Sequence, residues 1–292
     1  MSNIENRNRE PSMRSSSVTW EYLPIEIVCE MTTKLGFHAT EVMRKHMIRA
    51  KTKELLKQFS ELSSSRLGLE ICALNNIDGQ TFDPFGGRRA YTSTLQNLKE
   101  AVDMADGLGV KDVFVWEGIR PKIPKSGARK KNDKTLLDTV TRLFREAINY
   151  SAPKKIGFIT EPHPFTLGMD LDFLIKLCDS LDRNYFGVLY DCCHFGVGKP
   201  NDYIEPIRAL GKRIKHIHFS DSDQKSSELH FPPGMGRLDL NAIVSAFKEI
   251  DYQGTITLDL YGYPMPEEGS KIGILALKDI MLKLGLTNRN RD

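Results

Sequence analysis

Residues 254–259 read Gly-Thr-Ile-Thr-Leu-Asp, a short run in which polar and apolar side chains alternate. Successive side chains of a β-strand point to opposite faces, so the two threonines and Asp259 share one face, and Ile256 and Leu258 share the other. In a barrel of parallel strands, the apolar face packs against surrounding helices and the polar face points toward the barrel axis. The run therefore predicts a barrel strand that ends in a carboxylate.

Three further strand candidates end in a carboxylate or an imidazole. One ends at Glu161, a second ends at Asp191, and a third carries His218 near its end. In a (β/α)8 barrel the carboxyl ends of all strands meet at one mouth, where this fold carries its chemistry. We therefore expect these three side chains and Asp259 to converge at the mouth.

Amphipathic helical runs separate the strand candidates. Leu95, Leu98, Val102 and Ala105 recur at helical spacing, and Gly109 follows as a C-terminal stop. Alternating strands and helices are typical of a parallel sheet in an α/β protein. Strands are predicted at residues 37–42, 67–73, 112–116, 155–161, 186–191, 213–219 and 254–260, and a shorter eighth at 18–22 would open the barrel.

The strand count predicts an α/β fold that consists of a single (β/α)8 TIM barrel. The competing architecture is a doubly wound open sheet. That sheet would be supported by a Gly-x-Gly-x-x-Gly sequence after its first strand, and the chain has none. The closed barrel is therefore the favoured prediction.

The chain has 292 residues, close to the ~250 that such a barrel needs, and no linker-like segment interrupts its middle. Residues 1–17 are polar, rich in arginine and serine, and without the apolar run of a secretory signal. We predict a flexible N-terminal tail over residues 1–17 and one barrel domain over residues 18–287.

Charge and cysteine content narrow the class of function. The 41 basic and 38 acidic residues give a net charge of +3, which is too mild to indicate nucleic-acid binding across the surface. No segment is long and apolar enough to span a bilayer. The five cysteines are odd in number and form no Cys-x-x-Cys pair. This pattern predicts reduced thiols in a cytoplasmic protein, with neither a nucleic acid nor a membrane as partner.

Carboxylates that converge at one mouth repel each other unless a cation lies between them. Glu161, Asp191 and Asp259 offer oxygen donors, and His218 offers an imidazole. Three oxygen donors and one imidazole are typical of a site for Mn²⁺, Mg²⁺ or Co²⁺ and differ from the thiolate donors of a zinc site. We therefore predict one divalent metal ion at the mouth.

Several motifs follow each other in a fixed order, mostly in the second half of the chain. They are Glu161-Pro162-His163, Asp191-Cys192-Cys193-His194, His216-Ile217-His218-Phe219-Ser220-Asp221, His230-Phe231-Pro232-Pro233-Gly234-Met235-Gly236 and Gly254-Thr255-Ile256-Thr257-Leu258-Asp259. In this order and spacing the sequence resembles the xylose-isomerase-like barrels, a family of sugar phosphate isomerases and epimerases. The resemblance covers residues 23–284 and implies the same TIM barrel fold.

The resemblance implies a single-metal ligand set of Glu161, Asp191, His218 and Asp259, with Zn²⁺ as a further candidate ion. It also implies that Glu161 and Asp259 exchange protons with the substrate and that His194 hydrogen-bonds it, which makes these three the predicted catalytic residues. The sequence departs from the family at Asp259, where Glu is usual. Because Asp is one methylene shorter, we expect Glu161 to be the base and Asp259 to be mainly a ligand.

Seven further residues are predicted to contact the substrate. They are Glu41, Trp116, Glu117, His163, His216, Glu228 and His230. An ordinary ion pair is the alternative for Glu41 and Glu117, which end strands at the mouth. Glu228 and His230 stand where many relatives have Asp-x-His, and a second metal site is their alternative. His216 could instead be a hydrogen-bonded histidine inside the barrel.

The resemblance implies a metal-dependent isomerase or epimerase that acts on a small sugar-like substrate such as a keto-sugar or cyclitol. A carboxylate would abstract the proton next to the carbonyl, and the metal would stabilise the resulting enediolate. A dehydratase or lyase that shares this first half-reaction is the main alternative. Less favoured are an endonuclease IV-like phosphodiesterase, whose additional histidines are missing from the third and fourth strand ends, and a barrel that binds a ligand without turnover. A homo-oligomer is compatible with the resemblance.

The segment over residues 120–134 carries seven basic residues and one acidic residue. A solvated loop is the simpler interpretation of this segment. A lid that gathers an anionic substrate is the alternative.

Overall fold

Eight parallel strands pair in the order β1-β2-β3-β4-β5-β6-β7-β8 and close into a barrel. The computed structural model describes residues 13–47, 53–77, 83–119, 121 and 133–286. The strands are β1 Arg14–Ser16, β2 Ala39–Met43, β3 Glu70–Asn75, β4 Asp112–Val115, β5 Gly157–Thr160, β6 Phe186–Asp191, β7 Ile214–Phe219 and β8 Thr255–Leu258. The predicted (β/α)8 barrel is confirmed.

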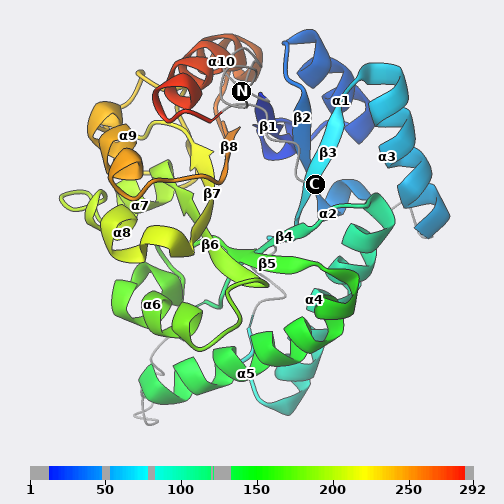
Figure 1. The fold of residues 1–292 in the computed structure, drawn as a ribbon, viewed down its shortest axis with the longest axis vertical. Helices are drawn as coiled ribbons and strands as arrows, with labels where there is room; N and C mark the ends of the chain where they lie inside the picture. The colour runs from blue at the N-terminus through cyan, green and yellow to red at the C-terminus, as the bar shows by residue number, and fades with distance from the viewer. Residues whose placement is uncertain (1–12, 48–52, 78–82, 120, 122–132, 287–292) are drawn as a thin grey trace, which may run out of the picture.

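The helices surround the ring of strands, as Figure 1 shows. The α-helices are α1 Ile25–Lys34, α2 Arg44–Met47, α3 Lys53–Leu67, α4 Arg88–Leu108, α5 Asp133–Ser151, α6 Leu171–Asp179, α7 Cys192–Gly198, α8 Glu205–Leu210, α9 Leu240–Glu249 and α10 Pro266–Lys283. The described part of the chain also contains short 3-10 helices, η2 Ser17–Trp20, η3 Ala152–Lys154, η4 Leu167–Met169 and η5 Gly211–Arg213. Across the described residues, no helix combines the length and the apolar character that crossing a bilayer requires.

Glycine ends the long helix α4 as the sequence predicts. Gly109 follows the helix at φ 77°, in the left-handed region that a residue without a side chain adopts at little cost. Its N–H donates to the carbonyl of Asp106 within the last turn. The chain therefore turns directly from α4 toward β4.

The first strand lies nearer the N-terminus than the sequence predicts. The prediction of a strand at residues 18–22 is wrong, because β1 comes before that stretch, which instead forms most of η2 and the turn after it. Ser15 and Ser16 of β1 are buried and pair with β2. A strand of arginine and serine has no apolar alternation to reveal it. The barrel thus begins inside the predicted tail, of which residues 1–12 lie outside the described residues.

The barrel closes where its first strand meets its last. Ser15 of β1 pairs with Leu258 of β8. Just beyond this pair, the backbone N–H of Leu260 donates to Thr19 Oγ1 at 3.2 Å. These contacts join the two ends of the barrel sequence.

Apolar side chains form two separate groups on the two faces of the strands. The larger group lies between strands and helices, and includes Val188 and Tyr190 of β6. A smaller group inside the barrel contains Ala73, Phe114, Ile159 and Leu189, from β3 to β6. Polar side chains from β2, β7 and β8 also lie in the interior, among them Glu41, His216 and Thr257.

Candidate metal centre and active site

Four strand ends place polar side chains around one nitrogen, Nδ1 of His218. This nitrogen lies 2.8 Å from Glu161 Oε1, 3.1 Å from Asp259 Oδ2 and 3.6 Å from Asp191 Oδ2. The side chains come from the ends of β5, β6, β7 and β8, which are neighbours in the barrel. All four are buried. The structure therefore brings together the four residues that the sequence predicts as metal ligands.

A helix cap fixes the orientation of Asp191. This residue ends β6 and begins α7, and its Oδ1 accepts a hydrogen bond from the backbone N–H of His194 at 2.7 Å. The cap occupies one carboxylate oxygen and leaves Oδ2 facing His218 Nδ1 and, at 3.8 Å, His230 Nδ1. The Asp-x-x-His spacing thus has a local cause, because the cap directs both side chains to the same site.

The donor atoms fit a divalent metal ion. Among the described residues, His218 Nδ1 and Asp191 Oδ2 are buried without a hydrogen-bond partner. An unpaired buried polar group costs about 1–3 kcal/mol, and more when it is charged. Donor atoms of Glu161, Asp191 and His218 all lie within 4.8 Å of one another, so one cation could satisfy them together. Carboxylate oxygens with one imidazole suit Mn²⁺, Mg²⁺ or Co²⁺, and Zn²⁺ accepts the same donors.

Burial and mutual repulsion shape the protonation of this cluster. Burial raises the pKa of Glu161 and of Asp259, and neighbouring carboxylates add to the rise. Burial also acts to raise the pKa of Asp191, but the surrounding histidines outweigh it and hold that pKa below its usual value. For His218 burial acts to lower the pKa, but the surrounding carboxylates raise it well above the usual value. The metal-free cluster therefore holds protons that a metal ion would displace.

Glu41 and His216 lie inside the barrel and do not line the cavity at its mouth. Glu41 Oε2 is 3.0 Å from His218 Nε2, and Glu41 Oε1 is 2.8 Å from His216 Nε2. Burial acts to raise the pKa of Glu41, but both histidines outweigh it, so this carboxylate stays charged. The sequence predicts substrate contacts for both residues. The structure places both residues within their strands, buried and in contact with each other.

Glu117 is also turned away from the cavity. Thr160 Oγ1 donates to its Oε2 at 2.7 Å, and the backbone N–H of Gly168 donates to its Oε1. A side chain at Gly168 would lie 2.7 Å from the Glu117 carboxylate, so only glycine permits this approach. Burial raises the pKa of Glu117. The sequence predicts a substrate contact for Glu117, and in the structure its two carboxylate oxygens anchor the segment that carries His163.

Three histidine rings form one wall of the cavity. The ring centroids of His163 and His194 are 4.3 Å apart, and those of His194 and His230 are 5.1 Å apart. A hydrogen bond between His163 Nε2 and Glu228 Oε1 lowers the pKa of Glu228 to about 2. Burial lowers the pKa of His194 to about 3, so its ring is neutral near pH 7. The Nδ1 atom of His194 has no hydrogen-bond partner among the described residues, which leaves it available to a ligand.

The cavity at the mouth has a volume of about 850 Å³. Predicted site residues form part of its lining, namely Trp116, Glu161, His163, His194, Glu228, His230 and Asp259. A second part is polar and comes from β2, β3 and α4. There Arg44 donates to Asn76 Oδ1 at 3.0 Å and pairs with Glu100 at 2.6 Å, while Asn76 donates to Asn97 Oδ1 at 3.0 Å.

Sequence reasoning did not assign this Arg44–Asn76–Asn97 group. Arg44 directly follows β2, so the same strand-end argument that finds Glu161 could have found it. Asn97 lies inside α4, where a polar residue gives no sign of facing a cavity. Only the tertiary structure brings these three side chains together.

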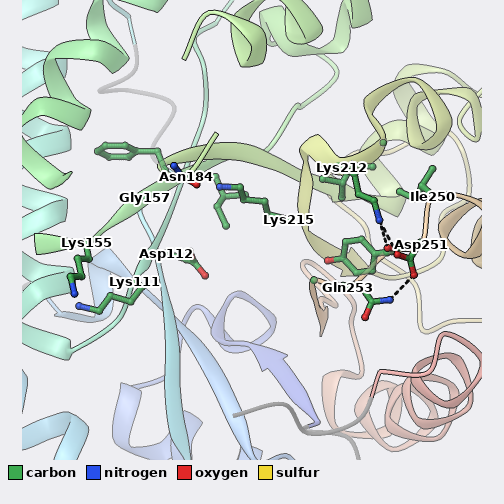
Figure 2. Close-up of a pocket in the computed structure, with 16 residues that line it drawn as sticks. Lys111, Asp112, Lys155, Gly157, Asn184, Lys212, Lys215, Ile250, Asp251 and Gln253 are labelled. Carbon is green, nitrogen blue, oxygen red and sulfur yellow. Dashed lines mark hydrogen bonds and ion pairs between the residues drawn. The ribbon is translucent and has the colours of Figure 1, made fainter. Parts of the chain in front are cut away.

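A second cavity, of about 410 Å³, lies at the opposite end of the barrel, where the strands begin. Figure 2 shows Lys111 and Lys155 on one side of it, and Lys212 with Asp251 on the other. Lysine ammonium groups here donate to backbone carbonyls of neighbouring segments: Lys111 to Lys154 at 3.3 Å, Lys212 to Asp251 at 2.8 Å, and Lys215 to Arg183 at 2.5 Å. None of the predicted site residues lines this cavity. The basic segment over residues 120–134 lies largely outside the described residues.

A comparison with protein families matches residues 29–280 to the description "Xylose isomerase-like TIM barrel". The chain belongs to this family. The match begins in α1 and ends in α10, so it contains every strand end that contributes to the cluster around His218. The resemblance inferred from the motifs is thereby confirmed.

Curated relatives of this xylose isomerase-like barrel include an isomerase and a dehydratase. Inosose isomerase from Bacillus subtilis is 25% identical over 254 residues, which cover 85% of this chain and 87% of that protein. Inosose dehydratase from Clostridium perfringens is 24% identical over 276 residues, covering 86% and 87%. An uncharacterized protein from Methanocaldococcus jannaschii is 24% identical over 173 residues, which span only 58% of that protein.

Solved structures share the fold over nearly the whole chain. A D-tagatose 3-epimerase-like protein superposes with a TM-score of 0.74 at 20% identity, covering 94% of this chain and 98% of that one. The IOLI protein, crystallised with a zinc atom, gives 0.73 at 20% identity and covers 93% and 98%. A probable 3-DHS dehydratase from Bacillus anthracis gives 0.70 at 14% identity and covers 96% and 100%. At these identities the likeness establishes the fold.

Proposed function

We propose that this xylose isomerase-like barrel is a divalent-metal-dependent isomerase or epimerase of a small sugar-like substrate. The observation that supports this most is the convergence of Glu161, Asp191 and Asp259 on His218 Nδ1 beside the mouth cavity. Buried carboxylates so close together are costly for a protein that makes no use of them. Membership of the family and the names of the relatives support the same proposal.

Glu161 is the proposed base. It lines the cavity, and burial raises its pKa, which makes the carboxylate a better acceptor for a proton bound to carbon. The metal ion, when bound, supplies Lewis-acid polarisation of the substrate carbonyl. Glu161 takes the proton from the carbon next to that carbonyl. Return of this proton to the former carbonyl carbon, with transfer of the hydroxyl proton between the two oxygens, gives an isomer. An epimer instead requires a second acid that protonates the opposite face of the same carbon, and Asp259 is the carboxylate available for that step.

Asp259 and His194 have supporting roles in this proposal. Asp259 is one methylene shorter than glutamate, and its Oδ2 already lies 3.1 Å from His218 Nδ1, so it acts mainly as a ligand. His194 is neutral because burial lowers its pKa to about 3. It therefore hydrogen-bonds a substrate oxygen and orients the substrate, while Glu161 moves the proton.

The lining of the cavity supports a polyhydroxylated substrate. Imidazoles, carboxylates and side-chain amides offer donors and acceptors for hydroxyl groups, and Trp116 offers an apolar face. The volume of about 850 Å³ is within the range that encloses a small molecule. The relatives named for inosose favour a keto-cyclitol, and the solved epimerases of similar fold favour a keto-sugar.

A dehydratase is the second candidate, favoured by the match to inosose dehydratase. It would use the same proton transfer to Glu161. The next step differs, because the hydroxyl group on the neighbouring carbon then departs and leaves with a proton as water. The two candidates therefore share the first half-reaction and give different products.

A solvent-exchange assay tests the proposal. Protein treated with a chelator and protein reloaded with Mn²⁺, Co²⁺, Mg²⁺ or Zn²⁺ are incubated in D₂O with inosose, D-tagatose, D-psicose or L-ribulose. We expect metal-dependent uptake of deuterium next to the carbonyl, detected by NMR, together with an isomeric product. Loss of water from the product, detected by mass spectrometry, would favour the dehydratase.

Two results would contradict the proposal. One is the absence of deuterium uptake with every metal and every substrate, although the protein is folded. The other is metal-dependent incision of duplex DNA at an abasic site that is lost in His218→Ala, which would favour a phosphodiesterase.

A further inference from the structure

Glu41 lies in the barrel interior and has no role in the proposed proton transfer. It belongs to β2, is fully buried, and pairs in register with Ser16 of β1 and Ala73 of β3. These two neighbours are small. The carboxylate of Glu41 crosses the interior and meets the two histidines of β7.

The contact with His218 concerns the ring nitrogen that faces away from the carboxylate cluster. Nε2 of His218 lies 3.0 Å from Glu41 Oε2, while Nδ1 faces Glu161, Asp191 and Asp259. A neutral imidazole carries one proton and one lone pair. If Nε2 donates its proton to Glu41, the lone pair lies on Nδ1, where a cation can accept it.

Glu41 is itself held from its other side. Its Oε1 lies 2.8 Å from His216 Nε2, an ion-pair distance. His216 contacts the hydroxyl groups of Thr257, at 3.0 Å, and Thr255, both on the adjacent strand β8. These contacts place Glu41 between the two histidines, so the carboxylate is positioned to fix the orientation of the His218 ring.

We propose that Glu41 is a positioning residue for the metal site. It holds His218 as the tautomer protonated at Nε2 and directs Nδ1 to the ion, and His216 keeps Glu41 in place. This inference rests on the proposed function only in requiring that the cluster binds a metal. Carboxylates that hold a ligating histidine in this way typically change metal affinity about 10- to 100-fold when they are removed.

A purely structural role is the alternative. In that case Glu41 would contribute to folding stability, and its replacement would leave metal affinity and ligand geometry unchanged. Glu117 provides a matched control, because it is an equally buried carboxylate that bonds to Thr160 and Gly168 and does not contact the cluster around His218.

The experiment measures Co²⁺ binding by the full-length protein from the visible absorption of the bound ion. Glu41→Leu should raise the dissociation constant about 10- to 100-fold and change the shape of the spectrum. Glu41→Gln keeps an acceptor oxygen without the charge, so its effect should be smaller. Glu117→Gln should lower thermal stability and leave both the dissociation constant and the spectrum as in the wild type.

A measurement on the wild type keeps the inference testable if the Glu41 variants do not fold. In Zn²⁺-loaded protein, ¹⁵N NMR of the histidines should show the His218 proton on Nε2 and no proton on Nδ1. A proton on Nδ1, or Glu41 variants with wild-type affinity and spectrum, would overturn the positioning role and leave the proposed function intact. Failure of the wild type to bind any divalent ion would overturn both.

Discussion

Charged side chains at the two ends of the barrel differ in burial and in their hydrogen-bond partners. At the carboxyl end, Glu161, Asp191 and Asp259 are buried around a histidine nitrogen that has no hydrogen-bond partner among the described residues. At the amino end, Lys111 and Lys212 are exposed, and each donates to a backbone carbonyl next to another strand. One end therefore holds buried charges around this unpaired nitrogen, and the other has exposed charges that already have partners.

This difference indicates that the two ends of the barrel have different roles. In TIM barrels the carboxyl end carries activity and the amino end contributes stability. Here the division follows from the partners of the charged groups rather than from their number. Lysines that hold adjacent βα units together need no ligand, whereas buried carboxylates that converge on one imidazole, with Asp191 Oδ2 and His218 Nδ1 unpaired within the described part of the chain, favour a cation.

The largest effect should come from Glu161→Gln at the carboxyl end. Glutamine keeps the size of the side chain and one oxygen but cannot accept the proton, so exchange of the α-proton should fall about 100- to 10,000-fold. Metal content should stay near the wild-type value. The exchange rate is measured by NMR in D₂O at saturating metal. If Asp259→Asn abolishes exchange with metal bound while Glu161→Gln does not, the roles of base and ligand are reversed.

Asp259→Asn should act on the metal rather than on the proton. Removing this charge should weaken metal binding by about 10- to 100-fold or more, with activity partly restored by excess metal. Titration with Mn²⁺ or Co²⁺ measures the dissociation constant. Glu249→Gln, which changes an exposed carboxylate in an ion pair with Arg208, is the control and should bind metal normally. An unchanged constant in Asp259→Asn would remove this residue from the ligand set.

Metal binding should stabilise the whole barrel through its carboxyl end. A metal concentration of 100 times the dissociation constant adds about 2.7 kcal/mol to the free energy of unfolding, which shifts Tm by roughly 5 °C. His218→Ala should lose this shift, and Lys212→Met should keep it. Thermal melts with and without chelator make the measurement. A full shift in His218→Ala would show that the ion binds elsewhere.

Metal affinity should fall as the pH is lowered. The pKa values of Glu161, Asp259 and His218 are raised in the metal-free protein, so each group keeps its proton to a higher pH than usual, and that proton must leave before the ion binds. Protons therefore favour the metal-free state, and affinity should change about tenfold per pH unit for each proton released. Calorimetry in buffers of different ionisation enthalpy counts these protons. Affinity that stays constant between about pH 5 and pH 8 would contradict the assignment.

The smallest effect should come from the amino end. Lys111→Met, Lys212→Met and Lys215→Met should each lower the free energy of unfolding by about 0.5–1 kcal/mol, because each removes a partly exposed hydrogen bond to a backbone carbonyl, and Lys212→Met also removes an exposed ion pair with Asp251. The kinetic constants kcat and KM should not change. The contrast between the two ends would fail if phosphate stabilised the wild type and not the triple variant, since the amino-end cavity would then be a binding site.

The sequence predicts most of the fold because seven strands have a clear apolar or alternating pattern. The prediction for β6, at residues 186–191, agrees with the structure in both bounds. It fails at β1, where arginine and serine give no such pattern and pairing with β2 and β8 decides the strand. Pairing partners distant in the sequence cannot be recognised from local composition.

The candidate site shows the same limit. The sequence correctly predicts that Glu161, Asp191, His218 and Asp259 come together, because strand ends of a barrel share one mouth. It does not predict the partners of Glu117, because whether this carboxylate points to the cavity depends on Gly168, which lies in a separate segment. A strand end places a residue near the mouth, but tertiary contacts decide where its side chain points.

The closure of the barrel between β1 and β8 has a consequence for the order of folding. Thr19 and Leu260 are 241 residues apart in sequence, and such distant contacts must overcome a large loss of chain entropy before they form. Asp259 lies directly after β8, next to this junction. The proposed ligands all lie on or directly after β5 to β8, so an ion bound to them would tie β8, one side of this junction, to its neighbouring strands. A bound ion would consequently slow the opening of this junction, so metal removal should accelerate unfolding more than it retards refolding.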